Sequence, residues 1–198
     1  MTRSSVKCTL SGIGSFKEDQ KTKTLNMPEL IPVIKKDEID SKVAEVARRI
    51  SNDYKNSELV LVGVLKGAFV FMSDLMRRLT IPVQIDFICA SSYGSGTSTS
   101  GDIKLTKELG IDIYNKDVLI VEDIIDTGLT LAYLIEYLKS FSPKSIGICA
   151  MLDKRERRRT DIKIDYSCHV VEDGFLVGYG LDYAENYRNL PEIYHLKL

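Results

Sequence analysis

The sequence predicts an α/β domain built on a doubly wound parallel sheet. Apolar runs at residues 59–65, 118–121 and 145–152 have the length and composition of strands that are buried on both faces. Segments with the apolar period of amphipathic helices lie between these runs. Strands that alternate with helices are typical of a parallel sheet, and a chain of 198 residues suits one such domain with a full core.

The N-terminal quarter is expected to hold a tail and one helix. Residues 1–27 are rich in Ser, Thr, Lys and Gly without a sustained apolar period, so we expect a flexible tail. Ordered sequence is expected to begin near residues 30–34. A helix follows that Asp40 or Ser41 can cap. Its apolar face is formed by Val43, Val46, Ala47 and Ile50.

The rest of the chain is expected to alternate strands and helices around one long loop. The elements, in chain order, are a strand at 59–65, a helix at 68–79, strands at 83–90 and 118–121, a helix opening at 126–130 and running to 141, and strands at 145–152 and 175–179. The loop at 91–102 has Ser, Thr or Gly at ten of 12 positions, so it cannot pack a core of its own. A loop of this length between two strands favours a functional lid over an idle connection by about two to one.

The composition excludes several classes of protein. The hydrophobic share of 44% and the charged share of 28% are typical of a soluble globular protein, and the net charge of −1 gives no general attraction to nucleic acid or anionic membrane. No apolar run approaches the ~20 residues of a membrane span, and the N-terminal stretch is too polar for a secretory signal. Cys89 and Cys149 lie in apolar runs and no CxxC pair exists, which indicates reduced cysteines and a cytoplasmic location. His169 and His195 are the only histidines, which argues against a zinc site.

Residues 118–130 carry the densest chemical signal in the chain. Two acids, Glu122 and Asp123, follow the apolar run at the point where such a strand would reach the surface. The helix start then reads Asp126, Thr127, Gly128, Leu129 and Thr130. Helix N-terminal amides and threonine hydroxyls can hold a phosphate, and carboxylates at a strand end can accept hydrogen bonds from ribose hydroxyls. Because open parallel sheets bind ligands at the carboxyl ends of their strands, this stretch predicts a sugar-phosphate site.

Together with three other segments, this stretch resembles the hypoxanthine-guanine phosphoribosyltransferases, over about residues 30–196. The motifs that carry the resemblance occur in the family's order, at Leu65-Lys66-Gly67, Ser92-Tyr93, 121–128 and 175–183. The resemblance implies the type I phosphoribosyltransferase fold. It also implies a purine-salvage enzyme that transfers the ribosyl phosphate of phosphoribosyl pyrophosphate to hypoxanthine or guanine. The products would be IMP or GMP and pyrophosphate, and the cofactor would be Mg²⁺.

The resemblance assigns the ribose and its phosphate to the stretch at 121–130. Glu122 and Asp123 match carboxylates that flank the ribose hydroxyls, and with Asp182 they match the residues that bind magnesium. Neighbours on a strand point to opposite faces, so both acids face the sugar only if the chain turns there. Asp126 matches the acid beside the purine nitrogen that is protonated in the free base, although from composition alone an Asp here is a helix N-cap. The 5′-phosphate loop is matched by Thr127, Gly128, Leu129 and Thr130.

Two further segments match the pyrophosphate site, and one matches the lid. Lys66 and Gly67 match a loop whose backbone amide faces pyrophosphate and in which the family has a non-proline cis peptide, here the bond before Lys66. Arg188 matches the arginine that binds pyrophosphate. From spacing alone, Lys66-Gly67 would be an ordinary turn and Arg188 a surface charge. Ser92 and Tyr93 match the pair that opens the mobile lid, which keeps water from the cation-like sugar.

The last third of the chain matches the base pocket. Lys154 matches the lysine that donates to the exocyclic oxygen of the purine, and Phe175 matches the aromatic ring that stacks on the base. Leu176 matches the residue whose backbone meets the base edge, and Asp182 lies in the same motif. The alternatives are that Lys154 belongs to a solvated basic run at 154–159 and that Phe175 is part of the core.

The resemblance also implies how the chain is organised. A phosphoribosyltransferase domain would span 28–198, with a core at about 40–170 and a small hood from 28–39 and 171–198. The resemblance implies a homodimer or homotetramer, whereas the net charge of −1 is the reason to expect neither nucleic acid nor membrane as a partner.

Two other functions fit part of the sequence. A phosphoribosyltransferase for xanthine, adenine or a pyrimidine would share the acidic pair and the phosphate loop, although the segments 124–126 and 175–183 favour a 6-oxopurine. An RNA-binding regulator on the same fold would be supported only by the basic run at 154–159, and the net charge of −1 opposes it.

Overall fold

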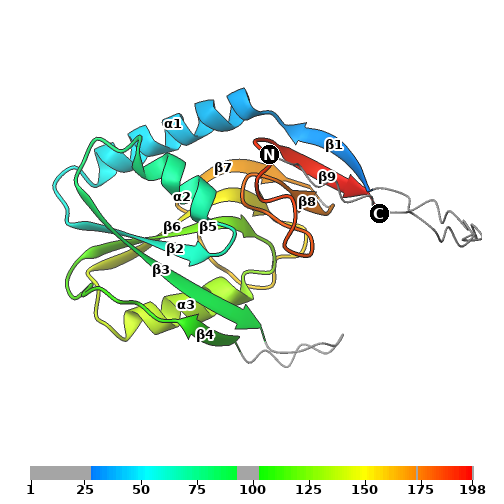
Figure 1. Ribbon diagram of the computed structural model, residues 1–198. Coiled ribbons are helices and arrows are strands. Elements are labelled where there is room, and N and C mark those ends of the chain that lie inside the picture. Colours follow the sequence, from blue (N-terminus) through cyan, green and yellow to red (C-terminus); the bar gives the residue numbers. More distant parts are fainter. Residues whose placement is uncertain (1–27, 93–102, 173, 198) are drawn as a thin grey trace, which may run out of the picture.

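The computed structural model describes residues 28–92, 103–172 and 174–197, and it confirms the doubly wound α/β architecture (Figure 1). The main sheet has six strands in the order β4-β3-β2-β5-β6-β7. Neighbours from β3 to β7 are parallel, and β4 pairs antiparallel with β3 at one edge. The strands are β2 (Leu59–Leu65), β3 (Val83–Ser92), β4 (Ile103–Lys107), β5 (Asp117–Ile125), β6 (Ser145–Lys154) and β7 (Tyr166–Val171). The expected tail at 1–27 lies outside the described residues.

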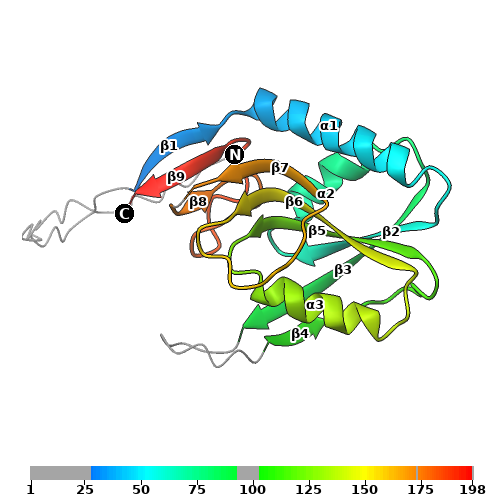
Figure 2. The ribbon, with the colours of Figure 1, turned by 180° about the vertical axis from the view of Figure 1, so that it is seen from behind.

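Helices cover both faces of the main sheet, as Figures 1 and 2 show from opposite sides. The helices are α1 (Lys36–Asp53), α2 (Phe69–Met76) and α3 (Leu129–Lys139). Leu59 and Leu61 of β2 pack in one buried cluster with α1 and α2, whereas Val60 and Val62 pack in a second cluster with α3. This division follows from the alternation of side chains along a strand, and it explains why the central strands contain continuous apolar runs.

Helix α1 begins at Lys36, so the prediction that Asp40 or Ser41 caps it is wrong. Ile39 is buried and extends the apolar face of the helix by one turn toward its N-terminus. Asp37 lies in the first turn, where a negative charge complements the positive end of the helix dipole.

The two ends of the described chain meet in a second, three-stranded antiparallel sheet with the order β1-β9-β8 (Figure 2). Its strands are β1 (Glu29–Ile34), β8 (Leu176–Val177) and β9 (Ile193–Lys197). Of the strand predicted at 175–179, only β8 forms, and it belongs to this second sheet. No helix among the described residues is long and apolar enough to cross a membrane.

Candidate active site

The carboxyl ends of β5 and β6 and the start of α3 form one edge of the main sheet, and the predicted site lies there. β5 continues to Ile125, so Glu122 and Asp123 lie within the strand. The chain does not turn between them, and their side chains line different pockets. One pocket contains Thr127 and the other contains Lys154, and we call them the Thr127 pocket and the Lys154 pocket.

The Thr127 pocket has a volume of about 120 Å³ and is formed by Glu122, the loop 126–128 and the first turn of α3. Gly128 is the N-cap residue of α3 and has a φ of 81°, a left-handed conformation that favours glycine. Asp126 therefore does not cap the helix. A side chain at Gly128 would also place its Cβ 2.1 Å from Thr160 Oγ1. Residues 126–130 include the N-terminus of α3, and backbone amides at a helix N-terminus can hold a phosphate.

The segment after β6 holds this loop in place. Arg158 donates from Nε to the carbonyl oxygen of Asp126 at 3.1 Å and from Nη2 to that of Ile125 at 3.2 Å. Its Nη2 also contacts Asp153 Oδ1 at 2.6 Å, and the Arg158 side chain is only 17% exposed. The basic run at 154–159 is therefore only partly solvated: Lys154 is buried and Arg158 is partly buried, whereas Arg155 is exposed.

The Lys154 pocket is larger, at about 520 Å³. Lys154 is 5% exposed and donates from Nζ to the carbonyl oxygen of Gly174 at 3.1 Å. Phe175 is 48% exposed. The alternative prediction, that Phe175 is part of the core, is therefore wrong. The Phe175 ring instead meets the edge of the Tyr183 ring, with 5.4 Å between centroids. Leu176 and Asp182 complete the predicted group, and all four base-site residues line this pocket.

Asp126 lines both pockets and therefore lies at their junction. Its Oδ2 forms an ion pair with Arg157 Nη1 at 3.2 Å. Its Oδ1 is buried and has no hydrogen-bond partner. Buried polar atoms are normally satisfied, so an unsatisfied carboxylate oxygen at this junction is a good position for a ligand N–H. Arg157 lines the Lys154 pocket as well, and the sequence analysis did not identify it.

The residues matched to the pyrophosphate site meet between β2 and the segment after β8. The peptide bond between Leu65 and Lys66 is cis, as the resemblance implies. Gly67 faces Asp123 so closely that a Cβ would lie 1.6 Å from its Oδ2. Gly180, with a φ of 101°, faces the Gly67 backbone, and a Cβ on it would lie 2.1 Å from the Gly67 carbonyl oxygen. Glycines at these two positions bring three segments of the chain into direct contact.

Arg188 and Lys66 lie at this contact, together with two acids. Arg188 donates from Nη1 to the carbonyl oxygen of Gly180 at 2.8 Å, and its Nη2 lies 2.7 Å from Asp182 Oδ1. Glu185 Oε2 lies 3.4 Å from Arg188 Nη2 and 3.1 Å from Lys66 Nζ. The Nε of Arg188 is buried without a partner. The side chains of Lys66 and Arg188, two of the residues predicted at the pyrophosphate site, thus meet on the carboxylate of Glu185, which no sequence motif identifies.

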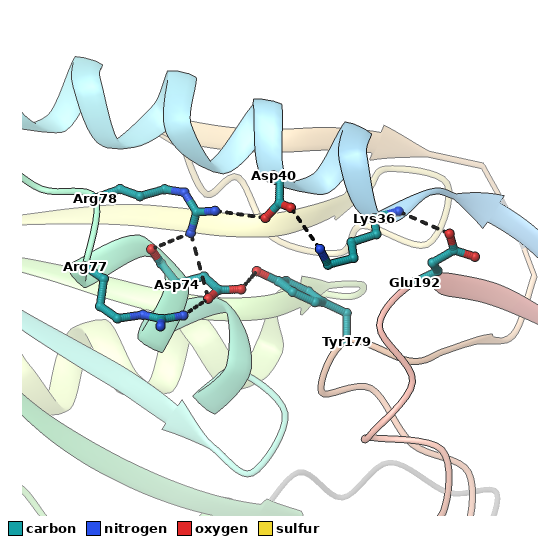
Figure 3. Close-up of polar contacts among 7 residues, drawn as sticks. All are labelled: Lys36, Asp40, Asp74, Arg77, Arg78, Tyr179 and Glu192. Atoms are coloured by element: carbon teal, nitrogen blue, oxygen red, sulfur yellow. Dashed lines mark hydrogen bonds and ion pairs between the residues drawn. The ribbon is translucent and has the colours of Figure 1, made fainter.

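A polar network anchors the loop after β8 to α1 and α2 (Figure 3). The hydroxyl of Tyr179 donates to Asp74 Oδ2 at 2.8 Å. Asp74 also pairs with Arg77 and Arg78 of the same region, and Arg78 Nη2 reaches Asp40 Oδ1 of α1 at 2.8 Å. Burial and the bond to Asp74 raise the pKa of Tyr179 well above its ordinary value, so the phenol keeps the proton that it donates. These contacts therefore anchor the loop that carries Asp182 and Arg188 to the helices that cover the main sheet.

The two strand acids lie in an environment that disfavours their charge. Burial raises the pKa of Glu122 well above its ordinary value, and the negative charge of Asp123 raises it further. Burial raises the pKa of Asp123 to about 6, against the lowering effect of backbone hydrogen bonds and of Arg188. Glu122 Oε2 is buried without a hydrogen-bond partner. Groups that donate hydrogen bonds or carry positive charge would stabilise both carboxylates.

The carboxylates of the site fit a magnesium ion that is bound mainly by substrate and water oxygens. Among the residues that the structure describes, no three His, Cys, Asp or Glu side chains form a metal cluster. Magnesium usually binds through one or two protein carboxylates together with water and substrate oxygens. Asp123 and Asp182 both line the Lys154 pocket. This pair can supply those carboxylates, whereas Glu122 lines the other pocket.

The predicted lid lies almost entirely outside the described residues. Ser92 ends β3, and Tyr93 with the rest of the loop to residue 102 lies outside the described residues.

Comparisons with known proteins agree with this arrangement. The family model for a phosphoribosyl transferase domain matches residues 35–184. A hypoxanthine phosphoribosyltransferase of Salmonella typhimurium is 51% identical over 158 residues, which cover 79% of this chain and 89% of the relative. A hypoxanthine-guanine phosphoribosyltransferase of Bacillus subtilis is 46% identical over 165 residues, which cover 83% and 92%. A crystal structure of a hypoxanthine-guanine phosphoribosyltransferase from Bacillus anthracis has a TM-score of 0.82 and 45% identity, and covers 85% of this chain and 100% of its own.

The chain therefore belongs to the phosphoribosyltransferase family, and it is an enzyme that transfers a pentosyl group. Within that family it groups with the hypoxanthine-guanine phosphoribosyltransferases, as the four sequence motifs indicate. The resemblance on which the sequence analysis rests is confirmed, and neither an adenine or pyrimidine enzyme nor an RNA-binding regulator is favoured.

Proposed function

We propose that this enzyme transfers the phosphoribosyl group of phosphoribosyl pyrophosphate to hypoxanthine or guanine, giving IMP or GMP and pyrophosphate. The observation that carries the proposal is the junction at Asp126, where a pocket with phosphate-binding geometry meets a larger pocket with an aromatic ring and a buried lysine. A nucleoside monophosphate has its phosphate and its base at the two ends of one ribose, which is the arrangement that two joined pockets fit.

Each predicted residue has a role in this reaction. In the Thr127 pocket, Thr127, Gly128 and Thr130 hold the 5′-phosphate together with the backbone of Leu129, the first residue of α3. Glu122 lines the same pocket and accepts hydrogen bonds from the ribose, whereas Asp123 faces the Lys154 pocket. Lys154 donates to the 6-oxo group of the purine, Phe175 stacks on its ring, and the backbone of Leu176 meets its edge. Asp126 Oδ1, which is buried and unpartnered, accepts the ring proton as the base becomes a nucleotide.

The pyrophosphate side completes the mechanism. The Lys66-Gly67 backbone and the Arg188 guanidinium bind the leaving group and neutralise the charge that develops on it. Asp182 and Asp123 are the carboxylates that would hold Mg²⁺ next to it, with Glu122 on the opposite face of the strand. Bound Mg²⁺ supplies positive charge that stabilises the departing pyrophosphate. Ser92 and Tyr93 open a lid that keeps water away from the sugar.

The proposal is tested by product formation with each purine. The purified enzyme, phosphoribosyl pyrophosphate and Mg²⁺ are incubated with hypoxanthine, guanine, xanthine or adenine, and pyrophosphate release is measured. We expect turnover with hypoxanthine and guanine. Turnover with adenine alone, or with none of the four bases, would contradict the proposal.

Replacement of Lys154 with alanine is expected to raise the KM for the base by about 10- to 100-fold, because a hydrogen bond to a charged donor contributes ~1.5–3 kcal/mol. The KM for phosphoribosyl pyrophosphate should change by less than about threefold, since the lysine lines the other pocket. Lys163→Ala, at an exposed side chain, is the matched control. An unchanged KM for the base would remove Lys154 from the base site.

The raised pKa of Asp123 predicts that the ligand-free enzyme loses stability as the pH rises. The folded protein binds more protons than the unfolded chain between the ordinary pKa of 3.8 and the folded value of about 6, so the free energy of unfolding falls across that window. In EDTA at pH 8, Asp123→Asn is expected to be more stable than the unaltered enzyme by about 1–2 kcal/mol, and at pH 4 the two should be equal. Thermal unfolding from pH 4 to pH 8 measures this, with Asp161→Asn as an exposed control. Parallel stability curves for Asp123→Asn and the unaltered enzyme would refute it.

We also propose the cytoplasm as the compartment and a homodimer or homotetramer as the assembly. The described cysteines, Cys89, Cys149 and Cys168, are free thiols, as a reducing compartment requires. Light scattering of the purified protein at several concentrations tests the assembly state, and a monomer at all concentrations would contradict the second part.

A further inference from the structure

Glu185 lies between the side chains of Lys66 and Arg188, the two cationic residues at the proposed pyrophosphate site. One oxygen, Oε2, lies 3.1 Å from Lys66 Nζ and 3.4 Å from Arg188 Nη2. A pyrophosphate oxygen carries the same charge as a carboxylate and accepts the same N–H donors. The carboxylate therefore uses the contacts that a pyrophosphate group would use.

The Glu185 side chain is not needed for the shape of its loop. The turn is closed by backbone bonds, with Tyr183 N donating to Asn186 O at 3.2 Å and Asn186 N to Tyr183 O at 3.0 Å. Glu185 contributes its own amide, which donates to Asp182 Oδ2 at 2.9 Å. All three bonds involve main-chain N–H groups and survive the loss of the Glu185 carboxylate.

The Glu185 carboxylate is charged and can leave its partners. The hydrogen bond from Lys66 lowers the pKa of Glu185, and the one from Arg188 lowers it further. The side chains of Glu185 and Lys66 are 64% and 62% exposed, so water can replace either partner. Exposed ion pairs contribute only ~0.2–1 kcal/mol each, which makes this contact weak enough for a bound anion to break.

We propose that Glu185 is an internal competitor for the pyrophosphate group, which holds Lys66 and Arg188 until pyrophosphate binds and displaces it. This inference rests on the proposed function and adds a residue that sets the affinity for its donor substrate and leaving group. Because the carboxylate returns when pyrophosphate departs, it weakens the binding of pyrophosphate and promotes its release. The 5′-phosphate binds in the Thr127 pocket, which Glu185 does not line, so nucleotide affinity is set independently.

The test is the affinity of Glu185→Gln for inorganic pyrophosphate with Mg²⁺, measured by calorimetry on the full chain. Glutamine keeps the size of the side chain and removes its charge. We expect the Kd for pyrophosphate to fall by about 3- to 10-fold, as the loss of two exposed ion pairs predicts. The Kd for IMP should change by less than twofold. Glu136→Gln, which removes the same charge from an exposed pair with Lys139 near the end of α3, should change neither value.

A second variant measures the coupling. In a Lys66→Met background, Glu185→Gln should tighten pyrophosphate binding by a smaller factor, because one of its two competing contacts is already gone. Unchanged or weaker pyrophosphate binding by Glu185→Gln would overturn the inference, and so would equal tightening by Glu136→Gln. These binding measurements do not require turnover. An enzyme that binds pyrophosphate but transfers nothing to a purine would refute the proposed function, while the competition itself would still be measured.

Discussion

Asp126→Asn is expected to lower kcat by about 100-fold or more, the usual contribution of a positioned general base. Asparagine has the same shape but cannot accept the ring proton of the purine. The structure argues that the fold will survive, because Gly128 and not Asp126 is the N-cap residue of α3, and Asp126 Oδ1 has no partner in the protein. The affinity for phosphoribosyl pyrophosphate should therefore stay within about threefold.

Steady-state turnover and calorimetric binding, measured side by side, separate these effects. Asp37→Asn, an exposed acid in the first turn of α1, serves as the control and should leave kcat unchanged. A kcat for Asp126→Asn within twofold of the unaltered enzyme would show that another group accepts the proton. If thermal stability falls together with turnover, the loss of the ion pair between Asp126 and Arg157 would explain the lower kcat instead.

Gly180→Ala is expected to destabilise the enzyme by about 2–3 kcal/mol, which lowers the Tm of a chain of this size by roughly 5–10 °C. Its φ of 101° is strained for alanine, and the new Cβ would lie 2.1 Å from the carbonyl oxygen of Gly67. Since a backbone atom is in the way, relief requires that the segments carrying Lys66 and Arg188 separate. The affinity for pyrophosphate should fall together with stability.

Gly110→Ala is the matched control for this substitution. A Cβ at Gly110 would lie 3.4 Å from Asp86 Oδ2, an ordinary contact. We expect its Tm to stay within about 2 °C of the unaltered value, as for a surface change of ~0.5 kcal/mol. Differential scanning calorimetry measures the Tm of both variants. Equal Tm values for Gly180→Ala and the unaltered enzyme would show that the loop accommodates the Cβ without loss of stability.

The sequence predicts the centre of the fold better than its edges. β2, β5 and β6 are apolar on both faces because helices cover both faces, so a continuous apolar run identifies them. β7 lies at the edge of the sheet and alternates buried with partly exposed residues, including Ser167 and His169, which weakens its signal. β1 contains Pro32, which is typical of an edge strand and argues against a central one. Helix α1 begins earlier than its polar residues suggest because burial of Ile39 outweighs the cap preference.

The candidate site divides in the same way. The stretch from Glu122 to Thr130 indicates a sugar-phosphate site from its own residues, whereas the role of Asp126 and the base and pyrophosphate residues come from the resemblance. The base residues line the Lys154 pocket, and Lys66 and Arg188 meet at Glu185. Arg157, Arg158 and Glu185 are not identified because each acts through a partner distant in the sequence. The sequence predicts Arg158 as one cation in a solvated run. Its hydrogen bonds to the carbonyl oxygens of Ile125 and Asp126 are visible only in the structure. A local pattern contains no information on such contacts.

The second sheet has a consequence for how the enzyme is made. Within the described residues, β1 and β8, which carries Leu176, each pair only with β9 at residues 193–197. During synthesis the N-terminal segments emerge first, and every strand of the main sheet precedes residue 172. The ribose and phosphate residues can therefore reach their final positions on a nascent chain, whereas the sheet that bears the base-binding backbone closes only after β9 has been made. A nascent chain that does not yet include β9 would hold the sugar side of the active centre without a finished place for the purine.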